Sequence, residues 1–195
     1  GVARKCQQMA MFRPAQIRAR FGVKLDTACP IFYMYWAFCS LIQGAHGCSF
    51  KHYLANTNRC RTHSLRNGNI KNILGLNIWD AKLPGVAQHL IDEAERGQTC
   101  NVFFVNAHCI NVAAVNRPYS ELLQSQPYVF ADGAGMALAG RILGCRLDNN
   151  VNGTDLFPEI CRAAAASGTP IALLGARPGI AERCANTMQL RFPEL

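Results

Sequence analysis

The chain has 195 residues, half of them hydrophobic, and a formal net charge of +8, which suffices for one globular domain with a buried core. The charge is uneven: residues 1–60 carry eight Lys or Arg and one acid, whereas residues 61–195 carry twelve Lys or Arg and eleven acids. Because the basic residues are not interleaved with a recognisable nucleic-acid reader motif, we exclude nucleic acid as a partner.

Residues 1–66 are predicted to be a basic, partly apolar extension, and residues 67–195 to form the main domain. Within the extension, Thr27–Phe50 has no Lys, Arg, Asp or Glu and exceeds the roughly 20 residues that cross a bilayer. Only Ile31–Ile42 is strongly apolar, so we favour a buried or interfacial segment, or a poorly ordered extension, over a membrane span. No clear cleavage site follows, so a cleavable signal peptide is not expected.

Regular elements begin at Asn72. In chain order, they are a strand over 72–78, a helix over 80–97, a strand over 101–106, helices over 107–116 and 118–124, a strand over 127–132, helices over 135–144 and 154–168, a strand over 169–175 and a helix over 178–192. This alternation predicts an α/β fold, a Rossmann-like sheet of mostly parallel strands with helices on both faces. In the first helix, Asp80 is predicted as the N-cap and Gly97 as the stop. The chain ends directly after a helix, so we expect the fold to lack its C-terminal elements.

Ten cysteines are present, but none forms a CxxC pair, and no set of Cys and His has the spacing of a zinc site. Cys145, Cys161 and Cys184 lie in apolar, helix-like patterns, where a thiol is usually a small buried hydrophobe. We therefore expect no metal site, no disulfide framework and a reducing, cytoplasmic compartment.

One charged residue stands out at the end of a predicted strand. Asp132 follows the apolar run PYVFA and precedes a helix of small residues, and the carboxyl ends of parallel strands are where open α/β sheets bind ligands. Its role is either chemical or that of a helix N-cap, which aspartate also favours. Gly133 and Gly135 form GxG, but Leu138 occupies the third glycine position, so a dinucleotide fingerprint is excluded. The strand-end loops remain able to hold a nucleotide through backbone N–H groups.

Three motifs carry a resemblance to a known family: ADGAGMALAGRILG, VNGTDLFPEI and ALLGARPGIAERCANTMQLRFPEL. In wording and order they resemble the WecG/TagA/CpsF glycosyltransferases, over about residues 72–195. The resemblance implies transfer of a hexose or N-acetylhexosamine, typically N-acetylmannosamine-like, from a UDP-sugar donor to a polyprenyl-diphosphate-linked sugar acceptor. It implies synthesis of bacterial cell-surface polysaccharide, no metal or other cofactor, and a peripheral position at the inner face of the cell membrane. Whether the chain forms a homo-oligomer stays open.

The resemblance also implies roles for residues. Asp132 matches the proposed base, and a single carboxylate suits a direct inverting displacement better than the paired carboxylates of a hydrolase. The substrate-binding candidates are Asn106, His108, Asn111, Gly133, Asn150, Gly153, Thr154, Asp155, Gly175, Arg177 and Gly179. Asn106 and His108 stand where the family commonly has a Thr-x-Asn pair, and Asn111 is a nearby substitute. The residues at 153–155 match G-[ST]-D, and those at 175–179 match the loop on the nucleotide side. The structural alternatives are a helix cap for His108 and for residues 153–155, and a plain turn for residues 175–179.

Two departures from the family favour another interpretation. Asn150 stands where the family often has an arginine that could stabilise the departing diphosphate; Arg141, Arg146 and Arg177 are the candidate substitutes. The family segment that completes the site and helps docking on the membrane would follow Leu195. The alternative function is therefore a catalytically impaired nucleotide-sugar-binding relative that acts as a pathway partner. In either case the basic N-terminal third is expected to attract anionic lipid.

Overall fold

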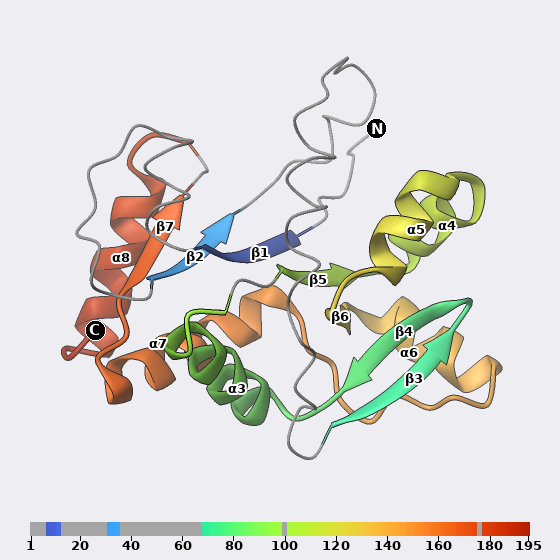
Figure 1. Cartoon of the computed structure of the whole chain (residues 1–195), viewed down its shortest axis with the longest axis horizontal. Coiled ribbons are helices and arrows are strands. Elements are labelled where there is room, and N and C mark those ends of the chain that lie inside the picture. Colours follow the sequence, from blue (N-terminus) through green and yellow to red (C-terminus); the bar gives the residue numbers. More distant parts are fainter. Residues whose placement is uncertain (1–6, 13–30, 36–67, 99–100, 175–176) are drawn as a thin grey trace.

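The computed structural model describes residues 7–12, 31–35, 68–98, 101–174 and 177–195 (Figure 1). The strands are β1 (Gln7–Phe12), β2 (Ile31–Tyr35), β3 (Asn69–Ile73), β4 (Leu76–Asp80), β5 (Asn101–Val105), β6 (Tyr128–Ala131) and β7 (Ile171–Leu174). The helices are α3 (Leu83–Glu95), α4 (Ala107–Val115), α5 (Arg117–Gln124), α6 (Ala134–Ile142), α7 (Gly153–Ser167) and α8 (Ile180–Arg191).

All of these strands belong to one sheet, in the order β3-β4-β6-β5-β1-β2-β7. β4 pairs parallel with β6, β6 with β5, and β2 with β7. β3 is antiparallel to β4, and β1 is antiparallel to both β5 and β2. Five described strands therefore run in one direction and two in the other, which confirms the prediction of mostly parallel strands.

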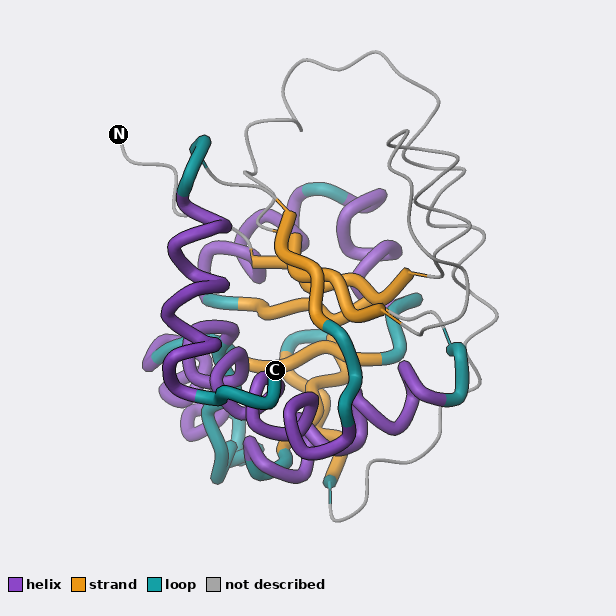
Figure 2. The backbone as a smooth tube through the Cα atoms, turned by 90° about the vertical axis from the view of Figure 1, so that its left-hand side faces the viewer, coloured by secondary structure: helices purple, strands orange, loops and turns teal. Residues whose placement is uncertain are grey.

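Helices cover both faces of the sheet, as predicted. On one face, α3 and α7 pack together over a core that contains Phe104 and Phe130, whose ring centroids are 6.2 Å apart. On the other, α4, α5 and α6 cover a second core that contains Phe103 and Val129. Successive residues of a strand point to opposite faces, so a strand buried on both sides is an unbroken apolar run, as β5 and β6 are. Figure 2 shows the strands as a twisted layer between helices.

The prediction of a single strand over 72–78 is wrong, because this segment turns back on itself. β3 and β4 form an antiparallel hairpin in which Ile73 pairs with Leu76. Leu74 and Gly75 occupy the two-residue turn, with φ of 51° and 84°. Positive φ at both positions is the pattern of a type I′ turn, which Asn-Gly usually signals. Leu-Gly lacks that signal, so the hairpin was not expected.

The predicted cap of the first helix is also wrong. α3 begins at Leu83 with Lys82 as its N-cap, and no side chain caps it. Proline favours the first turn of a helix, and Pro84 therefore sets this start. Asp80 is left on β4, two residues before the N-cap, where it does not reach the free N–H groups of the helix. The carboxylate of Asp80 binds Lys71 instead. At the other end, the helix stops before Gly97, as predicted.

The N-terminal third contributes two strands to the sheet. β1 and β2 lie between β5 and β7. Of the apolar segment Thr27–Phe50, only β2 is described, and it is paired in the sheet on both sides. The remainder of that segment, and most of residues 1–66, lie outside the described residues, so the domain boundary stays a prediction. In the part of the chain that is described, no helix has the length and apolarity needed to cross a bilayer.

Four cysteines are described, and none of these is in a disulfide: Cys109, Cys145, Cys161 and Cys184. Cys161 lies in α7 and is buried, as predicted, and burial raises the pKa of its thiol to about 12. Cys184 lies in α8 and is half-buried, whereas Cys145 lies beyond the end of α6. At neutral pH the Cys161 thiol stays protonated and acts as a small hydrophobe.

Candidate active site

Two parallel strands end side by side at the edge of the sheet where the predicted site residues lie. Val105, the last residue of β5, pairs with Ala131, the last residue of β6. The next residues along each strand are Asn106 and Asp132, and the N–H of Asp132 donates to the carbonyl oxygen of Val105 at 2.8 Å. Asp132 therefore stands at the carboxyl edge of a parallel pair, the place where open α/β sheets bind ligands.

The carboxylate of Asp132 is left without a structural task. The N-cap of α6 is Gly133, and no side chain caps this helix, so the interpretation of Asp132 as a cap is wrong. With φ of 88° and ψ of 169°, Gly133 places the preceding residue outside the helix. Among the residues that the structure describes, no group donates a hydrogen bond to this carboxylate. Its half-buried position raises its pKa, and the nearby charge of Asp155 raises it further.

A loop side chain is bonded directly to the turn that follows Asp132. The N–H of Gly133 donates to Oδ1 of Asn150 at 3.0 Å. The position that often carries an arginine in the family thus carries a side chain that holds the backbone beside the candidate base. The hydrogen bond to Gly133 gives Asn150 a structural role of its own.

The G-[ST]-D residues form the start of α7, next to this loop. The N-cap of α7 is Asn152, whose Oδ1 accepts from the N–H of Asp155 at 2.8 Å. The side chain of Asn152 in turn donates to the carboxylate of Asp155 at 2.6 Å. Gly153 is buried in the first turn, whereas Thr154 and Asp155 are exposed there. None of the three is itself the cap, which leaves the Thr154 side chain and the N–H groups of Gly153 and Thr154 open to a ligand.

The residues at 106–111 form the start of α4. Asn106 is the N-cap, and its Oδ1 accepts from the N–H of Cys109 at 3.1 Å. His108 is therefore not the cap of this helix, and it lies exposed in the first turn, with Asn111 exposed one turn later. The structure thus keeps both side chains on the surface, near the strand end that carries Asp132.

The starts of α4 and α6 meet at this edge. A Cβ added to Gly135 would lie 3.0 Å from Cβ of Ala107, so only glycine permits this close approach without a shift. Through Asn150 and Asp155, the start of α7 joins them. Each helix N-terminus carries a partial positive charge and free N–H groups, which suit an anionic ligand such as a diphosphate.

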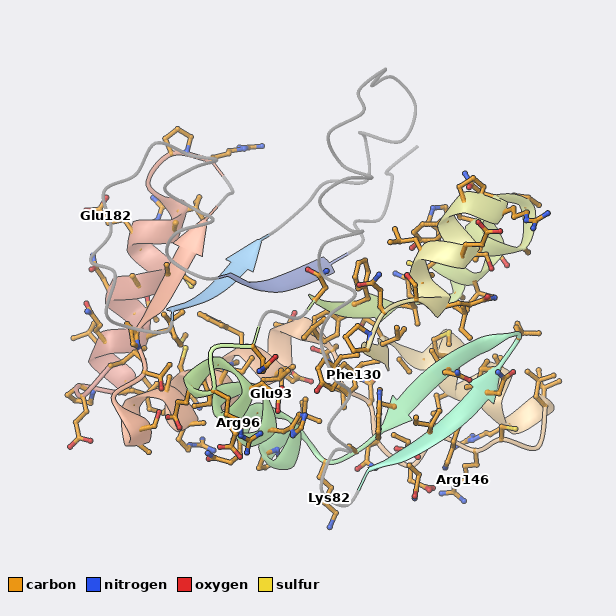
Figure 3. The ribbon with its side chains drawn as sticks, in the orientation of Figure 1. Lys82, Glu93, Arg96, Phe130, Arg146 and Glu182 are labelled. Atoms are coloured by element: carbon orange, nitrogen blue, oxygen red, sulfur yellow. The ribbon has the colours of Figure 1, made fainter. Side chains whose placement is uncertain are left out.

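The third predicted loop lies on another part of the sheet. Gly175 is outside the described residues, and Arg177 and Gly179 follow β7, with Gly179 as the N-cap of α8. β5, β1 and β2 separate β6 from β7. Four spacings of about 4.8 Å put β7 about 19 Å from β6. The structure therefore does not bring Arg177 and Gly179 to Asp132. In Figure 3, Glu182 of α8 lies well apart from Phe130 of β6.

The other two candidate cations do not pair with the Asp132 carboxylate. Arg141 lies exposed in the last turn of α6. Arg146 follows α6, and its Nε lies 3.4 Å from the carboxylate of Asp148. Across residues 68–98, 101–174 and 177–195, no three His, Cys, Asp or Glu side chains form a group that could hold a metal ion.

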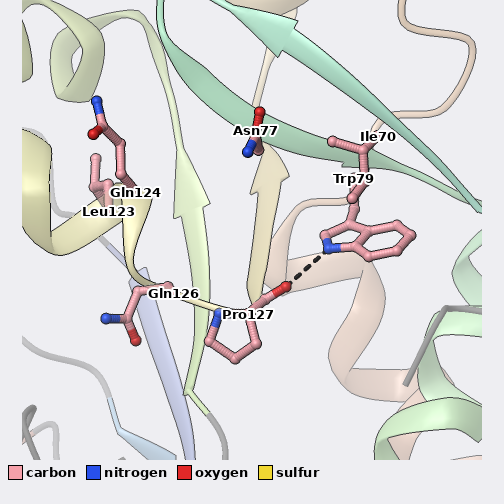
Figure 4. Close-up of a pocket in the computed structure, with 7 residues that line it drawn as sticks. All are labelled: Ile70, Asn77, Trp79, Leu123, Gln124, Gln126 and Pro127. Atoms are coloured by element: carbon pink, nitrogen blue, oxygen red, sulfur yellow. Dashed lines mark hydrogen bonds between the residues drawn. The ribbon is translucent and has the colours of Figure 1, made fainter. Parts of the chain in front are cut away.

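A hollow of about 330 Å³ lies elsewhere, between α5 and the β3–β4 hairpin (Figure 4). Its lining includes Leu123, Gln126, Pro127 and Trp79, whose indole N–H donates to the carbonyl oxygen of Pro127 at 2.8 Å. Pro127 precedes β6, so this hollow lies toward the amino end of that strand. None of the predicted site residues lines it, and we do not assign it to the site.

The sequence prediction missed one buried ion pair near this edge. Asp80 ends β4, which neighbours β6, and Trp79 pairs with Phe130. The side chain of Asp80 is 3% exposed, and its carboxylate lies 2.7 Å from Nζ of Lys71. The signal was available: in a hairpin that turns at residues 74–75, Lys71 and Asp80 are diagonal cross-strand neighbours. It could not be used because the hairpin itself was not recognised.

Comparisons with known proteins agree on one family. The family model described as "Glycosyl transferase WecG/TagA/CpsF family" matches residues 71–195. Similar curated relatives are three proteins of Staphylococcus aureus, from strains NCTC 8325 / PS 47, COL and MSSA476. Each is named N-acetylglucosaminyldiphosphoundecaprenol N-acetyl-beta-D-mannosaminyltransferase, and each is 26% identical to this chain over 125 residues, 63% of this chain and 49% of the relative. The chain spans about half the length of these relatives.

Proposed function

The chain belongs to the WecG/TagA/CpsF family of glycosyl transferases, and on this premise we propose that it is a sugar transferase for a lipid-linked acceptor. The names of the relatives support an N-acetylmannosamine-type sugar as the transferred group and a sugar on a polyprenyl diphosphate as the acceptor. The proposed donor of that group is a UDP-sugar. The observation that carries the proposal is the Asp132 carboxylate. It stands at the carboxyl edge of β6 with no hydrogen-bond donor among the described residues, beside three helix starts.

In the proposed reaction, Asp132 acts as the general base. A hydroxyl oxygen of the acceptor attacks the anomeric carbon of the donor and forms the new glycosidic bond, while the bond from that carbon to the diphosphate oxygen breaks. UDP leaves with the electron pair, and the carboxylate of Asp132 takes the hydroxyl proton. One displacement inverts the anomeric centre. A raised pKa makes the carboxylate a stronger base than an ordinary aspartate.

The remaining site residues bind the substrates in this proposal. The N–H groups at the start of α7, with Thr154, bind the diphosphate, because an anion is stabilised at a helix N-terminus. Asn106, His108 and Asn111 line the sugar side, and Gly133 and Asn150 form the floor beside the base. Asp155 sets the charge next to Asp132, and Gly153 lies buried in the first turn of α7. The loop with Gly175, Arg177 and Gly179 is proposed to bind the nucleotide. The transfer is proposed to need no metal, so activity should survive chelation by EDTA.

We further propose that the protein works at the inner face of the membrane as a peripheral protein. Leu138 and Ile142 lie one turn apart on α6, 58% and 75% exposed, with exposed Leu143 and Arg141 beside them. An apolar face with a cation suits the interface of an anionic bilayer. Flotation with anionic vesicles should weaken when Leu138 and Ile142 are both changed to Ser, and not with Leu190→Ser on α8. Equal flotation of all three proteins would refute this contact.

The transferase proposal is tested by UDP release from a panel of UDP-sugars with a polyprenyl-diphosphate-N-acetylglucosamine acceptor. Asp132→Asn should lower acceptor-dependent release by about 10²–10⁴-fold, the usual contribution of a general base, while the donor still binds. Asp92→Asn makes the same chemical change on α3, where the side chain accepts from Gln88, and should leave release unchanged.

Two other outcomes would decide against the proposal. Donor binding without turnover in the wild-type chain would favour the alternative, a nucleotide-sugar-binding relative that serves as a pathway partner. Turnover that Asp132→Asn leaves intact would show a transferase with another base. Because the chain spans half the length of its relatives, the assay is also run on a form extended to the natural C-terminus, where one exists.

A further inference from the structure

A buried ion pair holds the loop that follows α6. Oδ2 of Asp80 lies 2.7 Å from Nζ of Lys71 and accepts from the N–H of Asp148 at 3.0 Å. Oδ1 accepts from the N–H of Asn149 at 2.9 Å and from its side-chain amide at 2.8 Å. Lys71 also donates to the carbonyl oxygen of Arg146 and to the carboxylate of Asp148. We call this group, Lys71 and Asp80 with their bonds to residues 146–149, the loop clamp.

The loop clamp ends one residue before a side chain that contacts the turn after Asp132, the candidate base. Asn150 comes next, and its Oδ1 accepts from the N–H of Gly133. Beyond it, Val151 is buried and Asn152 caps α7, so the loop is fixed on its far side as well. The backbone around Asp132 is thus held from two directions, by Val105 of β5 and by this loop. In Figure 3, Arg146 lies beside the β3–β4 hairpin, as these bonds require.

The carboxylate of Asp80 is not free to act on a substrate. Each of its oxygens already has two partners, which uses the acceptor capacity of a carboxylate. Burial alone raises the pKa of this group, but the hydrogen bonds from Lys71, Asp148 and Asn149 outweigh burial and hold the pKa below its usual value. A group that is ionised, buried and fully paired can act only by fixing what it holds.

We propose that Asp80 is a positioning residue for the transfer reaction: together with Lys71 it fixes residues 146–149, so that Asn150 holds the N–H of Gly133 and, through it, the backbone of Asp132. This inference rests on the proposed role of Asp132 as the base. Replacing Asp80 by Asn puts an amide N–H against donors, loosens the loop and releases the hydrogen bond of Gly133. The base then spends less time at the reacting hydroxyl, and misplacement by about 1 Å costs about 10²-fold in rate.

The test measures kinetics and amide hydrogen exchange in the full chain. Asp80→Asn should lower kcat by about tenfold or more and leave the KM for the UDP-sugar within about threefold. Exchange of the Gly133 amide should become about fivefold faster or more, as expected for loss of one hydrogen bond. Asp92→Asn is the matched control and should change neither. A merely structural role would lower the melting temperature without a selective change at Gly133.

A double-mutant cycle separates positioning from independent effects. If Asp80 acts through Asn150, Asp80→Asn combined with Asn150→Ala should lower kcat no more than the stronger single variant. Multiplying effects would overturn the proposal, as would unchanged Gly133 exchange in Asp80→Asn. If Asp80→Asn does not fold, Lys71→Met serves as the second variant, because it leaves in place the N–H groups of Asp148 and Asn149 that donate to Asp80. Lys71→Met should still accelerate exchange at Gly133. An exchange rate equal to that of the wild type would overturn the proposal.

The exchange measurement also separates this inference from the proposed function. Exchange at Gly133 needs no turnover, so it reports the clamp even in a chain that does not catalyse transfer. Fast exchange in the variants without catalysis in the wild type would keep the clamp and count against the transferase. Catalysis that Asp132→Asn abolishes, with exchange and kcat unaffected by Asp80→Asn, would keep the transferase and remove the positioning role.

Discussion

Gly133→Ala should destabilise the protein without any steric clash. An added Cβ at this position would meet no heavy atom within 4 Å, so packing does not oppose it. The backbone, however, has φ of 88° and ψ of 169°, a region essentially restricted to glycine. Holding alanine there costs about 1–3 kcal/mol. For a chain of this size that corresponds to a fall in melting temperature of about 2–12 °C.

Gly85 of α3 supplies the matched control. Its added Cβ would also meet nothing within 4 Å, but its backbone is helical. Gly85→Ala should therefore raise the free energy of unfolding by about 0.4–1 kcal/mol, because alanine restricts the unfolded chain. Urea unfolding of both variants measures the two free energies. If Gly133→Ala is as stable as the wild type, or if both variants change stability in the same direction, the strained turn beside Asp132 is refuted.

Three further predictions concern charge and the hairpin turn. Asp155→Asn should move the acidic limb of the pH profile of kcat/KM to lower pH, because it removes a charge that raises the pKa of Asp132. The pKa that this limb reports should still exceed that of an ordinary aspartate, because burial, the larger cause of the shift, remains. Leu74→Asn should raise the free energy of unfolding by about 0.5–1 kcal/mol in urea, because Asn tolerates positive φ before Gly75 better than Leu does; an unchanged or lower value would contradict the turn. Because the pKa of Asp80 is lowered in the folded state, its ionised carboxylate stabilises the fold above the unfolded-state pKa of about 3.9. That contribution is lost as pH falls through the folded-state pKa. Asp80→Asn should therefore make the free energy of unfolding, followed by circular dichroism, decrease less on acidification than it does in the wild type.

The elements that sequence analysis located correctly are those whose buried side chains form a pattern within the element itself. β5 and β6 are short, continuous apolar runs, and α7 has apolar residues at helical spacing, so each predicts itself from a local pattern. The hairpin of β3 and β4 was not predicted because Leu74 occupies a turn position that usually carries Asn. The sheet order could not be predicted, since the pairing of β1 with β5 joins residues 91 to 97 positions apart and leaves no periodic pattern in the sequence.

For the candidate site, local patterns predicted the position of Asp132 at a strand end but not its partners. The bond between Gly133 and Asn150 spans 17 positions, and no spacing rule relates a loop amide to a turn N–H. Asp80 was interpreted as a helix cap because aspartate before an apolar helix usually is one. Its actual partners, Lys71 and Asn149, are brought to it by the hairpin and by the loop after α6, and neither was recognised in the sequence.

The ends of the neighbouring strands β4 and β6 carry two carboxylates with opposite environments. Both groups are desolvated, which raises a carboxyl pKa, yet the pKa of Asp80 is lowered and that of Asp132 is raised. The difference lies in the donors: Asp80 has Lys71 and the N–H groups of the loop, whereas Asp132 faces the charge of Asp155 and has no donor in the described part of the chain. Neighbouring carboxyls whose pKa values are driven apart commonly divide structural and reactive work. The two carboxylates can therefore be compared directly. Asp80→Asn should accelerate amide hydrogen exchange at Gly133, whereas Asp132→Asn should leave it unchanged.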